Sequence, residues 1–271
     1  MKRIIENIAG AVPSVRRVRE SLLESGNIPG SLWSELNRCS VLPQISCPRE
    51  TERAFEDGQV VLICHHTGHY PGALYLLASV PRKDTVILVD RTAWNFWTGN
   101  VKLENLIYIH GVSHQKAPDL KSKAIRLFTR KYLENSSPNF RKRVELNAQA
   151  YEEALEKLKE GKVVAITPDG GYHPQDRWNR RIGELVNNMD NDWMIVFSHI
   201  NDSPLTILAF TPGIGESIGP LLPKGKVHFS EPLKVKNIKS YCQFNGHPEA
   251  NNRETTHVLQ NMHRFWVNTL R

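Results

Sequence analysis

This chain lacks any run of about 18 uninterrupted apolar residues, the length that a membrane-spanning helix requires. Its first residues do not form a signal peptide either, because Glu6 interrupts the apolar part and Pro13 and a basic cluster follow. No repeat or low-complexity tract occurs in the 271 residues. We therefore expect a cytoplasmic protein without a membrane span, and leave peripheral contact with the inner membrane open.

Cysteine is scarce and scattered, at Cys39, Cys47, Cys64 and Cys242. Cys39 and Cys47 are too far apart for a CxxC pair, and Cys64 ends an apolar run. This usage is typical of a reducing compartment and excludes a disulfide framework or a cysteine-based zinc site.

The charge balance is basic, with a formal net charge of +7, which suits an acidic partner. Much of the excess lies in residues 113–143, where nine lysines and arginines accompany two acids, Asp119 and Glu134. Such a run is usually a solvated face, yet it is also the expected landing site for an anionic partner. It lacks the alternation of basic and aromatic residues that binds single strands, so we expect no nucleic-acid partner.

The most informative segment begins with the uncharged, β-branched run at 60–64, which is typical of a strand buried on both faces. His65, His66 and His69 follow within five residues, and Pro71 then opens an apolar stretch that predicts a helix. The pattern predicts a strand, a first elbow (residues 65–70) and a helix. Ligands of open α/β sheets bind at such strand ends. Imidazole is also well suited to take a proton from a hydroxyl or amine near pH 7.

A single histidine at a strand end is more often structural than catalytic. Three histidines around Gly68 favour a functional elbow. A second elbow (residues 167–172) follows the apolar run at 163–166 and reads Thr-Pro-Asp-Gly-Gly-Tyr.

Apolar runs and helical periodicity alternate along the rest of the chain. Further strands are predicted at 85–89, 106–109, 194–197, 205–210 and 227–229, and helices at 144–159 and 255–270. This alternation predicts an α/β fold with a mainly parallel central sheet flanked by helices. We expect it to span residues 56–271, after a helical N-terminal extension over residues 1–55. The amphipathic stretch at 15–23 fits a packing helix or a basic segment resting on a membrane.

The two elbows together resemble a motif pair of the glycerolipid and lysophospholipid acyltransferases. That superfamily carries a His followed five positions on by a carboxylate, and a later strand ending in Phe-Pro-Glu-Gly-Thr-Arg. Its lipid A late acyltransferase branch has His-x-Gly-Asn-Trp-Glu first and Pro-Asp before a short polar run later. Residues 66–71, His-Thr-Gly-His-Tyr-Pro, are similar to the first motif, and residues 166–171, Ile-Thr-Pro-Asp-Gly-Gly, to the second. The resemblance spans roughly residues 59–215.

One departure concerns the family carboxylate that orients the histidine, because Pro71 stands at its position. Asp169 is the obvious substitute, with Asp176, Asp90 and Glu184 as weaker candidates. The family also has a strand ending in Arg between the motifs. Arg91 matches that residue by letter, and the strand that ends at His110 matches it by distance from His66.

The resemblance implies an acyltransferase that moves an acyl group from an acyl-carrier-protein or coenzyme A thioester to a hydroxyl or amine. His66 would be the general base, supported by Asp169, with His69 and His65 as further catalytic candidates. Substrate contacts would come from the following residues: Gly68, Tyr70, Arg91, His110, Gly170, Gly171 and Tyr172. No metal and no bound cofactor are implied. The acceptor would be a small molecule or a lipid, and the basic run at 113–143 would dock the donor.

Three other interpretations remain open. The chain could be a binding protein that has kept the fold and lost turnover. The absence of a carboxylate at Pro71 favours this interpretation. A metal hydrolase could use His65, His66 and His69, although no flanking carboxylate completes such a site. The pair His65-His66 also begins the His-His-x-x-x-Asp-Gly motif of peptide-synthetase condensation domains, but Tyr70 and Pro71 replace its last two residues.

Overall fold

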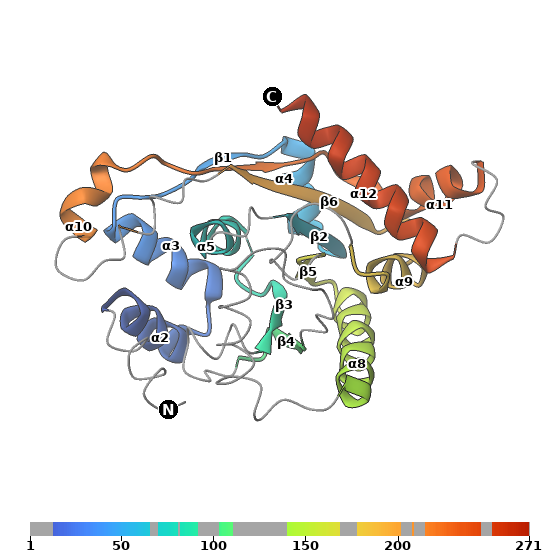
Figure 1. Cartoon of the computed structure of the whole chain (residues 1–271), viewed down its shortest axis with the longest axis horizontal. Helices are drawn as coiled ribbons and strands as arrows, with labels where there is room; N and C mark the ends of the chain where they lie inside the picture. Colours follow the sequence, from blue (N-terminus) through green and yellow to red (C-terminus); the bar gives the residue numbers. More distant parts are fainter. Residues whose placement is uncertain are drawn as a thin grey trace, which may run out of the picture.

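A computed structural model of the chain describes residues 13–65, 70–80, 82–91, 103–110, 140–168, 178–201, 208, 215–244 and 251–270. These residues form an eight-stranded sheet with helices on both faces (Figure 1). The predicted α/β class, with a mainly parallel central sheet flanked by helices, is confirmed. Within the described ranges, none of the helices combines the length and apolar character needed to cross a bilayer.

The strands are β1 (Gln44–Ser46), β2 (Val60–His65), β3 (Val86–Asp90), β4 (Leu106–Ile109), β5 (Val163–Ile166), β6 (Met194–Asn201), β7 (Lys226–Phe229) and β8 (Leu233–Lys234). The helices are α2 (Pro13–Ser25), α3 (Ile28–Arg38), α4 (Arg49–Asp57), α5 (Tyr70–Ser79), α8 (Phe140–Lys159), α9 (Arg181–Asn187), α10 (Gly215–Ile218), α11 (Val235–Phe244) and α12 (Asn252–Thr269), with a 3₁₀ turn η3 (Gly219–Leu221).

Most of the predicted elements are found where the sequence placed them. The strand at 194–197 is longer than predicted and continues to Asn201 as β6. The predicted helices at 144–159 and 255–270 begin earlier, at Phe140 and Asn252. The predicted strand at 205–210 lies outside the described residues except for Leu208, which is not in a strand. Strands β1 and β8 and helices α9, α10 and α11 were not predicted.

Five neighbouring strands run parallel in the order β6, β2, β5, β3, β4. β2 pairs with β5 from Val60 opposite Val163 to Ile63 opposite Ile166. β7 and β8 are antiparallel to β6, and β1 is parallel to β7. The prediction that strands 60–64 and 163–166 share a sheet, with their carboxyl ends at one edge, is therefore confirmed.

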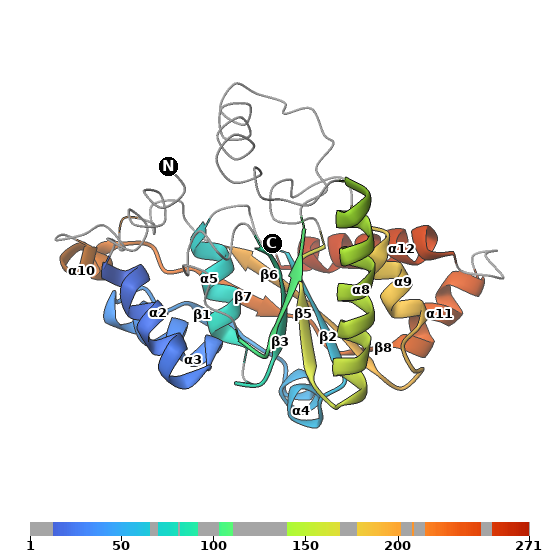
Figure 2. The same cartoon turned by 90° about the horizontal axis from the view of Figure 1, so that it is seen from below.

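Helices cover both faces of the sheet, which explains the continuous apolar run of β2. Val60, Leu62 and Cys64 pack in a core with residues of α2, α3 and α5. Val61 and Ile63 pack in a second core with residues of α8, α9, α11 and α12. Figure 2 shows these two groups of helices on opposite sides of the strands. All five residues are at most 1% exposed.

The amphipathic stretch at 15–23 lies in α2, which packs against α3. Leu22 is 1% exposed and belongs to the first core, while Leu23 next to it is 70% exposed. Arg17 of α2 donates two hydrogen bonds to Glu35 of α3, at 2.9 and 3.1 Å. These contacts are those of a packing helix. The division between residues 1–55 and 56–271 stays a prediction.

Two glycine turns meet at the amino-terminal edge of the sheet. Gly58, before β2, has a φ of 81°, and Gly161, before β5, has a φ of 79°. A Cβ on Gly58 would overlap the carbonyl oxygen of Gly161, whereas a Cβ on Gly161 would meet nothing within 4 Å. Arg82 donates hydrogen bonds to the carbonyls of Phe55 and Gly161, at 3.2 and 3.1 Å, and so joins the two turns.

Alanine substitutions at these two glycines distinguish the cost of backbone strain from the cost of steric overlap. Gly161→Ala should cost about 1–2 kcal/mol, because it only forces an alanine into the left-handed region. Gly58→Ala should cost roughly a further 1–3 kcal/mol, because the neighbouring backbone must also move. Urea unfolding of both variants measures the difference. Equal losses of stability would show that the close approach of the two turns is absent.

Candidate functional site

The structure describes only part of the predicted site. The following predicted residues lie outside the described residues: His66, Gly68, His69, Asp169, Gly170, Gly171 and Tyr172. The backbone places His65 as the last residue of β2 and Tyr70 as the first of α5. Pro71 therefore occupies the first turn of α5, as predicted. Arg91 and His110 are described in full. The catalytic and binding roles of all these residues stay predictions.

The helices that follow β2 and β5 along the chain cover opposite faces of the sheet. After β2 the chain reaches α5, whose Tyr75 and Leu76 pack in the first core. After β5 it reaches α9, whose Ile182 and Leu185 pack in the second core. Such a divergence between adjacent parallel strands is a topological switch point, where open α/β sheets form their ligand-binding crevice. The carboxyl ends of β2 and β5 thus lie where this fold class binds ligands.

A further histidine lies at the same edge of the sheet. His199 of β6 is the Cα partner of His65 in the parallel pairing of β6 with β2. Its side chain is half-buried. Sequence reasoning missed this histidine because the predicted strand ended at Phe197, which left His199 in an unassigned segment. The apolar residues around His199 were the available signal, because they could have extended the predicted strand past Phe197.

Arg91 lies closer to the elbows than His110 does. Arg91 directly follows β3, which pairs with β5, whereas His110 follows β4, which pairs only with β3 among the described strands. The Arg91 side chain is exposed. Burial raises the pKa of Tyr108 on β4, and the positive charge of Arg91 partly opposes that rise. Arg91 therefore places an exposed positive charge at this edge of the sheet.

The backbone of His110 is held by two hydrogen bonds to one side chain. Its N–H donates to Asn147 Oδ1 at 2.7 Å, and its carbonyl accepts from Asn147 Nδ2 at 2.8 Å. Asn147 lies on α8 and is buried. One side-chain amide thus acts in place of a neighbouring strand and fixes the chain where it leaves β4.

Cys64 immediately precedes the histidines but is not a nucleophile. Its side chain is 1% exposed, and burial raises the pKa of the thiol to about 12. Its sulfur lies 3.3 Å from the carbonyl oxygen of Leu62. Because the thiolate is the reactive form, a buried thiol that stays protonated is inert. The chemistry at the first elbow must therefore come from other groups.

Aromatic rings gather beside the carboxyl ends of β2 and β6, on the face covered by α12. We name the group the His263 cluster; it comprises Trp178, Phe197, His199, His263 and Trp266. The His263 ring lies 5.5 Å from the rings of Trp178 and Phe197, 5.9 Å from that of Trp266 and 6.4 Å from that of His199. Sequence reasoning missed this cluster because its members come from three distant segments.

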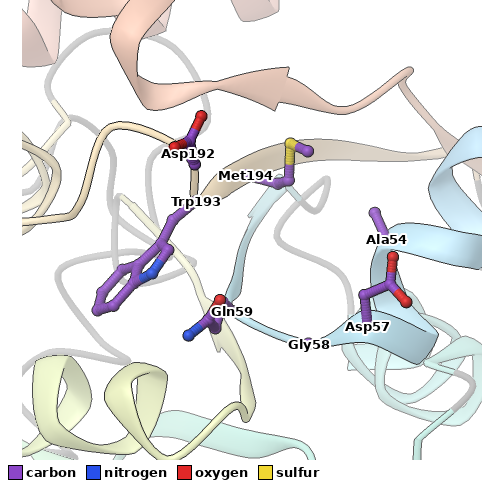
Figure 3. A pocket seen from close by; sticks show the side chains of 7 residues that line it. All are labelled: Ala54, Asp57, Gly58, Gln59, Asp192, Trp193 and Met194. Atoms are coloured by element: carbon purple, nitrogen blue, oxygen red, sulfur yellow. The ribbon is translucent and has the colours of Figure 1, made fainter.

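A small pocket lies at the opposite, amino-terminal edge of the sheet (Figure 3). It has a volume of about 190 Å³ and lies between the end of α4 and the start of β6. Asp57 and Asp192 lie on different sides of it, and Asp192 lies 3.6–3.7 Å from Lys236 and Lys234. The pocket is remote from both elbows, since parallel strands separate the two edges. We assign it no part in the predicted chemistry.

The described side chains include no group of three or more His, Cys, Asp or Glu residues that is arranged to hold a metal. The predicted trio of His65, His66 and His69 lies outside that search. Glu184, a weaker candidate for the supporting acid, is bound to Arg181 at 2.6–2.8 Å on α9.

Comparison with solved structures gives a likeness in fold. No protein-family model matches this sequence, and no curated protein matches it. The fold is similar to the crystal structure of the 1-acyl-sn-glycerophosphate (LPA) acyltransferase PlsC from Thermotoga maritima. The alignment covers 97% of this chain and 95% of that chain, with 12% identity and a TM-score of 0.46.

Proposed function

We propose that this protein is an acyltransferase that uses a thioester donor and works at the carboxyl edge of β2 and β5. The observation that carries the proposal is the switch point between these strands, each of which is followed in the sequence by a polar elbow. The first elbow holds the histidine motif and the second holds the Pro-Asp motif. Their order along the chain and their strand context are those of the acyltransferase motif pair.

His66 is the general base in this proposal. It takes the proton of an acceptor hydroxyl or amine, whose oxygen or nitrogen then attacks the thioester carbonyl carbon. The tetrahedral intermediate collapses with cleavage of the carbon–sulfur bond, and the departing thiolate recovers the proton from His66. Backbone N–H groups of the first elbow or His69 stabilise the oxyanion. Asp169 supports the imidazole from the neighbouring strand end, because Pro71 cannot.

The donor is the phosphopantetheine thioester of an acyl carrier protein or an acyl-coenzyme A, and both carry phosphate. Arg91 is exposed beside β5 and is suited to bind such an anion, as guanidinium groups bind phosphate well. Gly68, Tyr70, His110, Gly170, Gly171 and Tyr172 complete the proposed substrate contacts. The acceptor is a small molecule or a lipid.

The direct test is turnover of acyl thioesters by the purified protein. Acyl-coenzyme A and acyl carrier protein donors of several chain lengths are incubated with pooled hydroxyl and amine acceptors, and mass spectrometry follows release of the thiol and formation of the acyl product. We expect thiol release that depends on His66 and on the acceptor. Donor binding without turnover would contradict the enzyme and favour the binding protein.

The basic run at 113–143 should recruit the acidic donor. It lies almost entirely outside the described residues, and its nine-to-two charge count supports the proposal. Changing Lys121, Arg126 and Arg130 to Glu should raise the KM for a carrier-protein donor at low salt, because long-range attraction is lost. The increase should shrink as salt screens the charges. Unchanged kinetics at every salt concentration would show that the run is only a solvated face.

A further inference from the structure

The end of strand β4 is tied to helix α8 by a buried side chain to which the proposed reaction gives no part. Asn147 is 6% exposed, and its Oδ1 accepts a hydrogen bond from the N–H of His110 at 2.7 Å. Its Nδ2 donates to the carbonyl of the same residue at 2.8 Å. Since His110 is half-buried, loss of this amide would leave two backbone polar groups without their partner, which is costly.

Helix α8 is itself fixed on the sheet by the residues that follow Asn147. Its Tyr151, Ala154 and Leu158 side chains are at most 6% exposed, and they belong to the same core as Ile107 of β4. A helix packed in this way is a rigid support for the groups that it carries. Asn147 therefore joins the end of β4 to a fixed element.

One source of positive charge lies beside the end of β4. Asp90 of β3 is the Cα partner of Ile109 of β4. Arg91 and His110 are the residues that come next along the chain after these partners. The charge of Arg91 also reaches Tyr108 on β4, where it opposes the rise that burial causes in the pKa of the tyrosine. The exposed guanidinium group and the end of β4 are thus neighbours.

A second source of positive charge is the first turn of α8, which contains Arg141, Lys142 and Arg143 and no acidic residue. The Arg141 and Lys142 side chains are 92% and 55% exposed and lie 3.5 and 3.7 Å from Glu145. Figure 2 shows this start of α8 projecting beyond the carboxyl end of the sheet. Cations are unfavourable at a helix N-terminus, and proteins break such local rules mainly at functional sites.

We propose that Asn147 is a positioning residue that holds Arg91 and His110, at the ends of β3 and β4, in register with the basic first turn of α8 for binding of the donor. The chemistry shared by the two candidate donors is the phosphate of the phosphopantetheine arm, which guanidinium groups bind well. The first turn of α8 attracts the remaining negative charge of the donor. This inference rests on the proposed function, which supplies the donor.

The test compares Asn147→Leu, which removes both hydrogen bonds at similar side-chain size, with Leu158→Ala as the matched control. Leu158 lies at the far end of the same helix and is 0% exposed, so its truncation destabilises the fold through a cavity and leaves His110 untouched. Asn147→Ala is made as well, because its smaller side chain lets water reach the two backbone groups and favours a folded protein.

Two measurements are made on each protein. Hydrogen–deuterium exchange of the His110 amide, resolved by NMR, reports on the tie between β4 and α8. The kcat and KM are then measured with an acyl-coenzyme A and with an acyl carrier protein donor, which distinguishes the two sources of the phosphate.

Both Asn147 variants should speed exchange at His110 and raise the KM for the donor about tenfold, since small misplacements weaken oriented contacts steeply. The kcat at saturating donor should change little, because the chemistry lies at the first elbow. Leu158→Ala should lower the midpoint of urea unfolding and leave both measurements as in wild type. Arg91→Ala should also raise the KM, and adding Asn147→Leu to it should give less than the product of the two single effects.

Unchanged exchange at His110 would overturn the proposal. An equal rise of KM in Leu158→Ala, or a fall of kcat at unchanged KM in the Asn147 variants, would overturn it too. If wild type turns over neither donor while the variants exchange faster at His110, the result supports the tie between β4 and α8 and contradicts the proposed function.

Discussion

Replacing His66 with alanine should lower the rate of acyl transfer by about 10²–10⁴-fold, the usual contribution of a general base. His66 follows β2 and precedes α5, whose N-terminal dipole disfavours a protonated imidazole. The resting side chain should therefore be neutral and able to accept a proton. Folding should be little affected, because an elbow residue contributes little to either core.

His65→Ala is the matched control and should cost less turnover, since adjacent residues of an extended segment point to opposite sides. Circular dichroism on wild type and both variants checks folding, and rates at several pH values check the base. A folded His66→Ala protein with full activity would remove His66 from the mechanism. The base would then be His65 or His69, or the protein would be a binding protein.

Replacing Glu35 with alanine should lower the free energy of unfolding by about 2–4 kcal/mol, because it removes a buried carboxylate that two arginines share. The Glu35 side chain is 7% exposed and accepts hydrogen bonds from Arg17 at 2.9 and 3.1 Å and from Arg38 at 2.8 and 3.0 Å. Both arginine side chains are about a third exposed, so their guanidinium groups can turn to water and reduce the loss.

The matched control is Glu20→Ala, which breaks the exposed pair with Arg16 on the same helix α2. That pair is 3.9 Å apart with side chains 65% and 60% exposed, so its loss should cost under about 1 kcal/mol. Denaturant unfolding measures both variants. If Glu35→Ala and Glu20→Ala proved equally stable, the Glu35 carboxylate would not be what fastens α2 to α3.

The sequence by itself determined where the five central parallel strands, β2 to β6, lie along the chain. The run at 60–64 is buried on both faces and carries no charge, so its composition predicts a central strand without knowledge of its neighbours. The predicted helices at 144–159 and 255–270 follow from one-sided periodicity in the same way. Such signals are local, because an apolar run or a helical period is visible in the neighbouring residues of one segment.

Strand β1 shows where local signals end. Gln44, Ile45 and Ser46 are all exposed, so the segment has neither an apolar run nor alternation to predict it. It becomes a strand because β7 offers a parallel partner about 180 residues later, with Gln44 opposite Lys226. The pairing lies in backbone hydrogen bonds that any residue except proline can donate.

Only the tertiary structure decided which strands are neighbours, and so what lies at the carboxyl edge. β2 and β5 are about 100 residues apart in sequence yet pair directly, and their connections leave towards opposite faces. His199 lies beside His65 through register, and His263 reaches Trp178 through the docking of α12 on α9. These contacts depend on the order and packing of distant elements, which hydrophobic periodicity does not encode.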